Sequence, residues 1–303
     1  MLLLLPWYVY ALISATLVGV KSVFQKAELK KEHSLDYTVA FSLVAMIVAL
    51  FLWPWVKWGS ITWGSVAYVY MAALFGSVAI WMGTKALRHL ELSLVSPQTV
   101  LSTLFTLVFA HFFLGDTLTS GQMWGAMILV IGGALLAKGS FTPAHHWGWL
   151  ATVRVGDLFK QKTELFYEML LLGSMVLMGA SSVFDKFSLE RFDVVTFIFL
   201  ISIFLFVNHL VLYLLVVGDV RQIPGRVDHL GWLLVGIAVI ATVSRLAYSQ
   251  ALSMTELSLV TSIKHSSILI TTVIGGSLFK EKDVRWRVSI SLVMLIGVWL
   301  LVR

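Results

Sequence analysis

Apolar stretches of about 18–25 residues recur from one end of the chain to the other, and each can cross roughly 30 Å of hydrocarbon as a helix. Inside lipid, every backbone polar group must be hydrogen-bonded within the protein, and a helix achieves this within one segment. The chain is 59% hydrophobic and only 13% charged, whereas soluble domains are about a quarter charged. The sequence therefore predicts an all-α membrane protein in a lipid bilayer.

The net charge of +6 would suggest a nucleic-acid partner for a soluble protein. Here the basic residues lie mostly in the short connections between apolar stretches, where they determine topology instead. No nucleic-acid partner is therefore expected. The chain contains no cysteine, which excludes disulfides, thiol catalysis and thiolate metal sites.

Ten transmembrane helices are predicted in two groups of five. They lie near residues 5–25, 36–56, 62–84, 92–113, 121–137, 165–187, 193–217, 230–250, 257–279 and 285–302. The connection 139–164 is the long one, and a short helix lying in the membrane interface is expected there. The residues that suggest it are Trp147, Trp149, Leu150, Val153, Arg154, Leu158 and Lys160.

The two groups of five are copies of one unit, 1–138 and 165–303. The sequence "ELSLV" occurs at Glu91–Val95 and again at Glu256–Val260, and with this offset of 165 residues 86–136 align without a gap to 251–301. Near the front, "GVKSVFQK" at Gly19–Lys26 resembles "GASSVFDK" at Gly179–Lys186 with an offset of 160. A unit with an odd number of spans ends on the opposite side of the membrane. The second copy is therefore inverted, and inverted repeats indicate a transporter with its substrate site between the halves.

The "SVFQK" and "SVFDK" segments, the two "ELSLV" segments and the glycines of the fifth and tenth spans resemble the EamA-like members of the drug/metabolite transporter superfamily. The resemblance implies a transporter rather than an enzyme. It leaves the substrate open, because that family moves amino acids, metabolites, sugar conjugates and drugs. The family's second span commonly begins with an arginine, and "DYTVAFSLV" has none here.

Charge and resemblance disagree about orientation. The resemblance implies cytoplasmic termini, but the connections after the odd-numbered spans carry far more basic residues than the opposite side does. The richer side carries Lys26, Lys30, Lys31, Lys85, Arg88, Lys138, Arg154, Lys160, Lys162, Arg221, Arg226, Lys280, Lys282, Arg285 and Arg287, and the other carries Lys57, Lys186, Arg191 and Arg303. The positive-inside rule then predicts a cell-membrane protein with both termini outside the cytoplasm.

Three cations lie inside predicted spans: Lys21, Arg245 and Lys264. Each costs about 2.5–3.5 kcal/mol at the middle of an isolated span and needs a partner. Arg245 and Lys264 are both expected roughly 10 Å below the same surface, so they must share an anion. Two sources remain open. One is a structural ion pair with Asp185 or Glu256, and the other is the acidic group of a substrate.

The other candidate binding residues are His265, Gln98 and Thr99. The repeat offset pairs Lys264 with Thr99, and Pro97 leaves a backbone carbonyl without its helical donor, which favours a kink. Lys21 is either a binding residue or a lysine reaching towards the interface.

No metal site, cofactor or enzyme arrangement is expected. His145 and His146 have no ligands at metal spacing, and no catalytic constellation occurs at membrane depth. The leading prediction is a secondary transporter for a small anionic or zwitterionic metabolite. The alternatives are a broad exporter of amino acids or amphipathic compounds and, remotely, an intramembrane enzyme or lipid-handling protein. The coupling ion is left unidentified, and a homodimer is left open.

Overall fold

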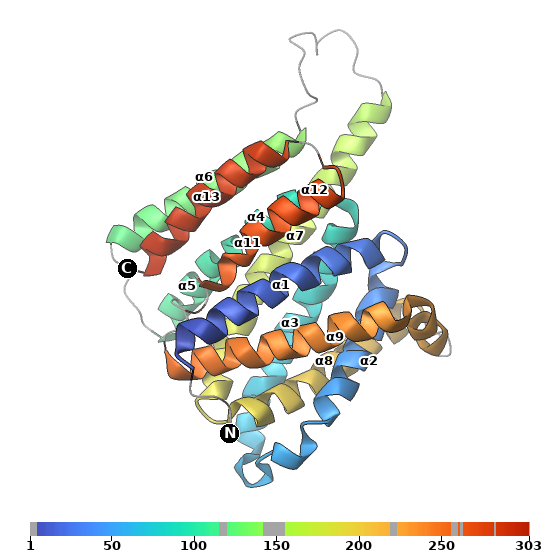
Figure 1. Ribbon diagram of the computed structural model, residues 1–303, viewed down its shortest axis with the longest axis vertical. Helices are drawn as coiled ribbons and strands as arrows, with labels where there is room; N and C mark the ends of the chain where they lie inside the picture. Colours follow the sequence, from blue (N-terminus) through green and yellow to red (C-terminus); the bar gives the residue numbers. More distant parts are fainter. Residues whose placement is uncertain are drawn as a thin grey trace.

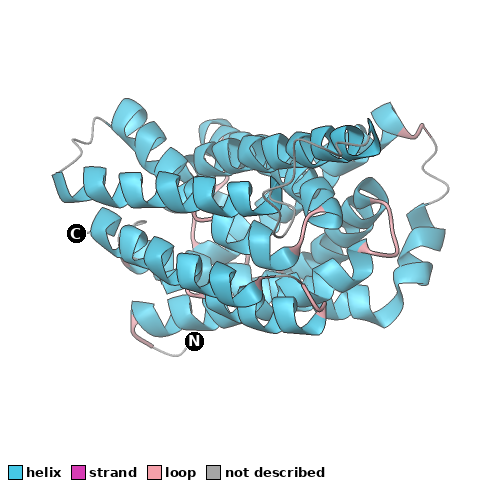
Figure 2. Ribbon diagram, turned by 90° about the horizontal axis from the view of Figure 1, so that it is seen from above, coloured by secondary structure: helices cyan, strands magenta, loops and turns pink. Residues whose placement is uncertain are grey.

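The computed structural model describes residues 5–114, 120–141, 155–218, 223–255, 260, 263–281 and 283–302. Every regular element in these ranges is helical, as Figure 2 shows. The first half contains α1 (Trp7–Leu29), α2 (Ser34–Leu50), α3 (Trp63–His89), α4 (Leu92–Gln98), α5 (Leu101–Leu114) and α6 (Ser120–Phe141). The second half contains α7 (Val155–Leu189), α8 (Val194–Val216), α9 (Ile223–Met254), α11 (Ser267–Ile270), η4 (Thr271–Gly275), α12 (Gly276–Leu278) and α13 (Val284–Val302).

Five of the described helices are long and apolar enough to cross a membrane. They are α1, α3, α8, the part of α7 from Thr163 to Leu189 and the part of α9 from Gly231 to Met254. Large apolar side chains cover the outside of the bundle: Trp63 is 92% exposed and Trp232 is 89% exposed. Such surfaces are typical of a lipid-facing protein rather than of a soluble monomer.

Two predicted spans have different ends in the structure. The span expected at 36–56 stops at Leu50 as α2 and continues into two short turns, Trp53–Trp55 and Trp58–Ser60. Pro54 has no amide hydrogen to donate to Leu50 one turn earlier, so the α-helix ends before it. The span expected at 230–250 begins as predicted but ends later, because non-helical Gly231 (φ 61°) divides α9 (Ile223–Met254) and the part that can cross the membrane is Gly231–Met254.

The central connection is shorter than 139–164. The helix α6 continues to Phe141 and α7 begins at Val155, so Leu158 and Lys160 belong to α7 rather than to a separate interfacial helix. No proline occurs in Val155–Leu189, and a helix is free to extend beyond the membrane where polar residues replace apolar ones. The remaining residues of the expected interfacial helix, from Trp147 to Arg154, lie outside the described residues.

The segment expected as one span at 257–279 is irregular in its described part. It consists of α11, the π-helical turn η4 and α12. The corresponding segment of the first half is also interrupted, because Thr99 and Val100 separate α4 from α5. Around this break the amides of Val100, Ser102 and Thr103 bond to carbonyls three residues earlier. These tighter bonds keep the backbone at the break hydrogen-bonded.

Equivalent helices of the two halves run antiparallel to each other, as the inverted repeat predicts. In the pair α6–α13, a Cβ added to Gly132 would lie 2.5 Å from Met294, and one added to Gly297 would lie 2.9 Å from Ile128. The contacted positions in α13 fall from 297 to 294 as those in α6 rise from 128 to 132, so the two helices run antiparallel, and Figure 1 shows them side by side. Only glycine allows such an approach, and small residues of this kind are typical of helix contacts in membranes.

In two further pairs, a helix of the first half packs against a helix of the second half. Helix α1 packs along α9, and α3 packs along α7. Ser14 contacts Ser244 in the first pair, and Ser181 contacts Ala72 in the second. Since α1 is the counterpart of α7 and α9 is the counterpart of α3, each half completes its packing only against the other.

Candidate functional site

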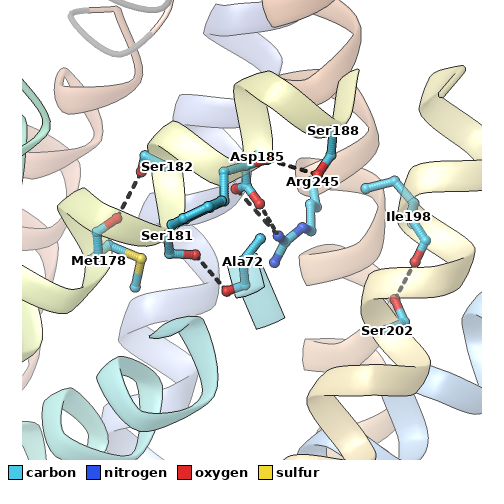
Figure 3. Close-up of polar contacts among 10 residues, drawn as sticks. Ala72, Met178, Ser181, Ser182, Asp185, Ser188, Ile198, Ser202 and Arg245 are labelled. Carbon is cyan, nitrogen blue, oxygen red and sulfur yellow. Dashed lines mark hydrogen bonds and ion pairs between the residues drawn. The ribbon is translucent and has the colours of Figure 1, made fainter. Parts of the chain in front are cut away.

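Asp185 and Arg245 face each other between α7 and α9, as Figure 3 shows. The Nη2 atom of Arg245 lies 3.5 Å from both carboxylate oxygens of Asp185. The side chains are 30% and 15% exposed, so neither is sealed into the core. The guanidinium also lies 5.7 Å from the ring centre of Phe197 on α8. Three helices therefore hold this ion pair.

Lys264 and Lys21 extend the charged cluster. The ammonium of Lys264 lies 4.2 Å from the ring centre of Tyr248, one turn after Arg245 on α9. Lys264 is close enough to interact electrostatically with Arg245, Asp185 and Lys21. Lys21 on α1 also interacts with Arg245. The structure thus brings together the three intramembrane cations that the sequence singled out, with Asp185 as the carboxylate between two of them.

His265, next to Lys264 in the chain, and Gln98 on α4 are both buried. The Nε2 atom of His265 lies 2.6 Å from the hydroxyl of Thr103 on α5, which ties the segment before α11 to α5. Gln98 is 2% exposed, and its side-chain nitrogen has no hydrogen-bond partner in the described structure. Thr99 is exposed, and its hydroxyl donates to the carbonyl of Ser96. His265 therefore serves packing in this structure, while Gln98 retains a free donor.

The charged residues all have uncharged counterparts in the other half. With the offsets of 160 and 165, the pairs are Lys21 with Ser181, Asp185 with Gln25, Arg245 with Ile80, and Lys264 with Thr99. The fold alone therefore does not require these charges, since the equivalent positions are folded without them.

Two motif lysines have a structural role that the sequence analysis missed. Lys26, the last residue of "SVFQK", is buried and donates to the carbonyls of Leu87 and Leu90 at 2.5 and 2.6 Å, at the end of α3. Its counterpart Lys186 points to the carbonyl of Leu252 near the end of α9, at 3.5 Å. A cation is favourable where the last carbonyls of a helix have no intrahelical donor. The lysine that ends both "SVFQK" and "SVFDK" was the feature of the sequence from which this structural role could have been predicted.

A second network closes the same end of the bundle as Lys26. The carboxylate of Glu281 accepts hydrogen bonds from the amides of Leu92 and Ser93, at 2.7 and 2.8 Å, where α4 begins. Arg287 on α13 contacts Glu91 and Glu281, and it donates to the hydroxyl of Ser93 at 2.6 Å. We call this end, defined by Lys26 and the Glu281–Arg287 network, the Lys26 end. The opposite end is the Lys186 end.

These contacts correct the assignment of some basic residues to connections. Lys26 and Arg287 are buried in α1 and α13, and Lys186 lies within α7. The count of basic residues along the sequence treated each lysine at a helix end as a loop residue. The carbonyls that such a lysine contacts lie in a distant part of the chain, so the sequence did not show the contact. The excess of basic residues on one side of the membrane, from which the orientation was predicted, therefore includes residues that lie in helices and not in loops.

A comparison with family models matches the EamA-like transporter family twice, over residues 5–138 and 165–303. These ranges agree closely with the two repeats read from the sequence. A solved structure named "Crystal structure of protein" is similar in fold, with a TM-score of 0.52 and 14% sequence identity. The similarity covers 95% of this chain and 96% of that one. A comparison with curated proteins finds no match. The two family matches together span nearly the whole chain, which therefore belongs to the EamA-like transporter family.

Proposed function

We propose that the protein is a secondary transporter for a small anionic or zwitterionic metabolite, with ten spans and two inverted halves that give alternating access. The observation that carries this proposal is the charge of the cluster. In the described part of the chain it contains the cations Lys21, Arg245 and Lys264 but a single carboxylate, Asp185. Cations at membrane depth are costly unless an anion compensates them, and the acidic group of a substrate supplies that anion.

Each residue of the cluster has a separate role in this proposal. Arg245 offers a planar fork of donors that suits a carboxylate or phosphate, and Lys264 adds a point charge beside it. Lys21 reaches the cluster from α1 in the other half, so that a bound acid touches both repeats. Gln98 contributes the free amide donor on the α4 side, and His265 and Thr99 shape the crossing of the two interrupted segments.

The two ends of the bundle support alternating access. At the Lys26 end, Lys26 and Arg287 donate short hydrogen bonds and Glu281 accepts them, and these bonds join α1 to α3 and α4 to α13 and to Glu281. At the Lys186 end, the equivalent lysine makes a 3.5 Å contact with Leu252 among the described residues, which stop at 255 in that segment. The break at Thr99–Val100 and the π-helical turn η4 provide bends next to the site, and such irregular segments are typical of transporter binding sites.

The proposal also includes the orientation of the protein in the membrane. We place the Lys26 end in the cytoplasm and both chain ends outside, because the basic residues still concentrate towards the Lys26 end. A reporter that is active only in the cytoplasm, fused after Arg303, is expected to stay inactive. An active reporter would reverse the assignment to the orientation that the family resemblance implies.

A second candidate is a broad exporter of amino acids or amphipathic compounds. The contact between Asp185 and Arg245 favours it, because this pair already neutralises one of the cations. In such a protein the charges would hold helices together and the substrate would bind elsewhere between the halves.

Uptake into proteoliposomes separates the two candidates. The purified full chain is reconstituted, and labelled carboxylic acids, sugar phosphates, amino acids and hydrophobic amines are offered one at a time. The leading proposal expects uptake of acids and competition among them. Uptake restricted to amines, or spread evenly over neutral and cationic compounds, would favour the exporter instead. Liposomes without protein provide the background.

A further inference from the structure

We infer that Asp185 is a place-holder for the acidic group of the substrate. In the unloaded protein its carboxylate occupies Arg245 and attracts Lys264, and an incoming acid displaces it. The inference rests on the proposed function, since it presupposes an acidic substrate. It assigns to Asp185 a role in setting how tightly that substrate binds.

The geometry of the pair is that of a replaceable contact. Both oxygens of Asp185 lie 3.5 Å from the same nitrogen of Arg245, whereas charge-assisted hydrogen bonds are typically about 2.7–2.9 Å long. The 30% exposure of the Arg245 side chain leaves room for another anion to approach it. The attraction is therefore mainly one of charge, without the short bonds that fix a structural pair.

Arg287 shows what a structural pair looks like in the same molecule. Its side chain is 9% exposed, and Glu281 beside it is 4% exposed. Arg287 also donates a 2.6 Å hydrogen bond to Ser93 and contacts Glu91. Nη1 of that guanidinium has the Ser93 hydroxyl as a close partner and lies 3.8 Å from Glu281, and Nη2 has Glu91. For Arg245, in contrast, the described carboxylate partner is the loosely held Asp185.

The position of Asp185 makes it a competitor for the same cations. It interacts electrostatically with both Arg245 and Lys264, the two groups proposed to hold the acid. Two anions that share one guanidinium repel each other, so a bound acid and the Asp185 contact exclude each other. The other half has the uncharged Gln25 at the equivalent position. The carboxylate is thus present only in the half that also carries Arg245 and Lys264.

Anion binding to the purified full chain tests the inference, with inorganic phosphate as the probe. Phosphate is titrated in detergent against chloride at constant ionic strength, and its dissociation constant is read from the shift of thermal unfolding. Asp185→Asn removes the competing charge and keeps the shape, so we expect phosphate to bind about tenfold more tightly than to the wild type. The matched control is Glu190→Gln, an exposed carboxylate five residues later, which should leave the constant unchanged.

The remaining outcomes separate this role from a structural one. A lower melting temperature of Asp185→Asn with unchanged or weaker phosphate binding would overturn the inference and leave Asp185 as a structural partner. If Asp185→Asn does not fold, Asp185→Glu replaces it. The longer carboxylate reaches Arg245 more closely, so phosphate should bind several-fold more weakly, and unchanged binding would again overturn the inference. The proposed function fails separately, if the reconstituted wild type transports no acid.

Discussion

The helix pairs α1–α9 and α7–α3 occupy equivalent places in the two halves but differ in what lies between them. In α7–α3, Ser181 is 4% exposed and donates to the carbonyl of Ala72 at 2.9 Å. A Cβ on Gly76 would already lie 3.1 Å from the Ser181 hydroxyl. In α1–α9 the equivalent position is Lys21, which is partly exposed and interacts with Arg245.

In the proposed transport mechanism, one duplicated unit supplies a scaffold at one helix pair and the substrate site at the other. Small residues let α3 and α7 approach closely, and a close contact of this kind holds a membrane bundle together. The equivalent position in α1 carries Lys21 instead, and a charge at membrane depth needs water or a counter-ion. In the proposed mechanism, the charged pair binds the substrate and the small-residue pair holds the bundle together.

Exchanging the residues at the equivalent positions should give the largest effect. Ser181→Lys buries an ammonium where no space or partner exists, so the free energy of unfolding should fall by about 3 kcal/mol. Lys21→Ser removes a partly exposed charge and should change stability by less than about 1 kcal/mol. Thermal unfolding of both variants in one detergent measures the difference. Equal losses of stability would show that the two pairs are not distinct in the way described.

Removing the proposed substrate contact should affect transport rather than folding. Lys264→Met keeps the length and apolar stem of the side chain, so we expect an unchanged melting temperature and roughly hundredfold lower kcat/KM for acid uptake. Lys57→Met, at an exposed lysine of the first half, is the matched control and should transport normally. Full uptake by Lys264→Met, together with lower thermal stability, would place Lys264 in the scaffold.

The two motif lysines sharpen the comparison between the ends of the bundle. Lys26 makes short hydrogen bonds to two carbonyls, whereas Lys186, within the part of the chain that the structure describes, makes one 3.5 Å contact. Lys26→Met should therefore lower the free energy of unfolding by about 2 kcal/mol, and Lys186→Met by less than about 1 kcal/mol. Chemical or thermal unfolding of the two single variants decides this. A larger loss for Lys186→Met would contradict the tighter closure of the Lys26 end.

The smallest expected effect concerns the polar contact that remains between α1 and α9. Ser14→Ala loses the 3.2 Å contact with the Ser244 hydroxyl, and such contacts between membrane helices are worth about 0.6 kcal/mol. Ser182→Ala, which loses a bond only within α7, should have no measurable effect. A loss above about 2 kcal/mol for Ser14→Ala would mean that α1–α9 is as tightly held as α3–α7.

Much of the architecture was predictable because hydropathy and internal repetition are properties of the linear sequence. The expected last span, 285–302, is nearly the observed α13, Val284–Val302. The early start of α7 at Val155 was not predictable from hydropathy, since that measure follows the membrane rather than the helix. The π-helical turn η4 was also not predictable from the sequence, because its geometry depends on packing against α4 and α1.

The site was predictable only in part, for a related reason. Buried charges are conspicuous in an apolar chain, so Lys21, Arg245 and Lys264 could be named from the sequence. Their depth could be estimated from helix rise. Which carboxylate lies beside them depends on the crossing of α7 and α9. The role of Lys26 likewise depends on carbonyls more than sixty residues away.

The inverted relation of the two halves is the central claim, and single cysteines test it directly. Lys31 and Arg191 are equivalent positions under the 160-residue offset, and both are exposed. The chain has no cysteine of its own, so Lys31→Cys and Arg191→Cys each give one labelling site. With a membrane-impermeant maleimide on sealed vesicles of known orientation, we expect one variant to react at once and the other only after permeabilisation. Reaction of both from the same side would contradict the inverted repeat and the transport mechanism built on it.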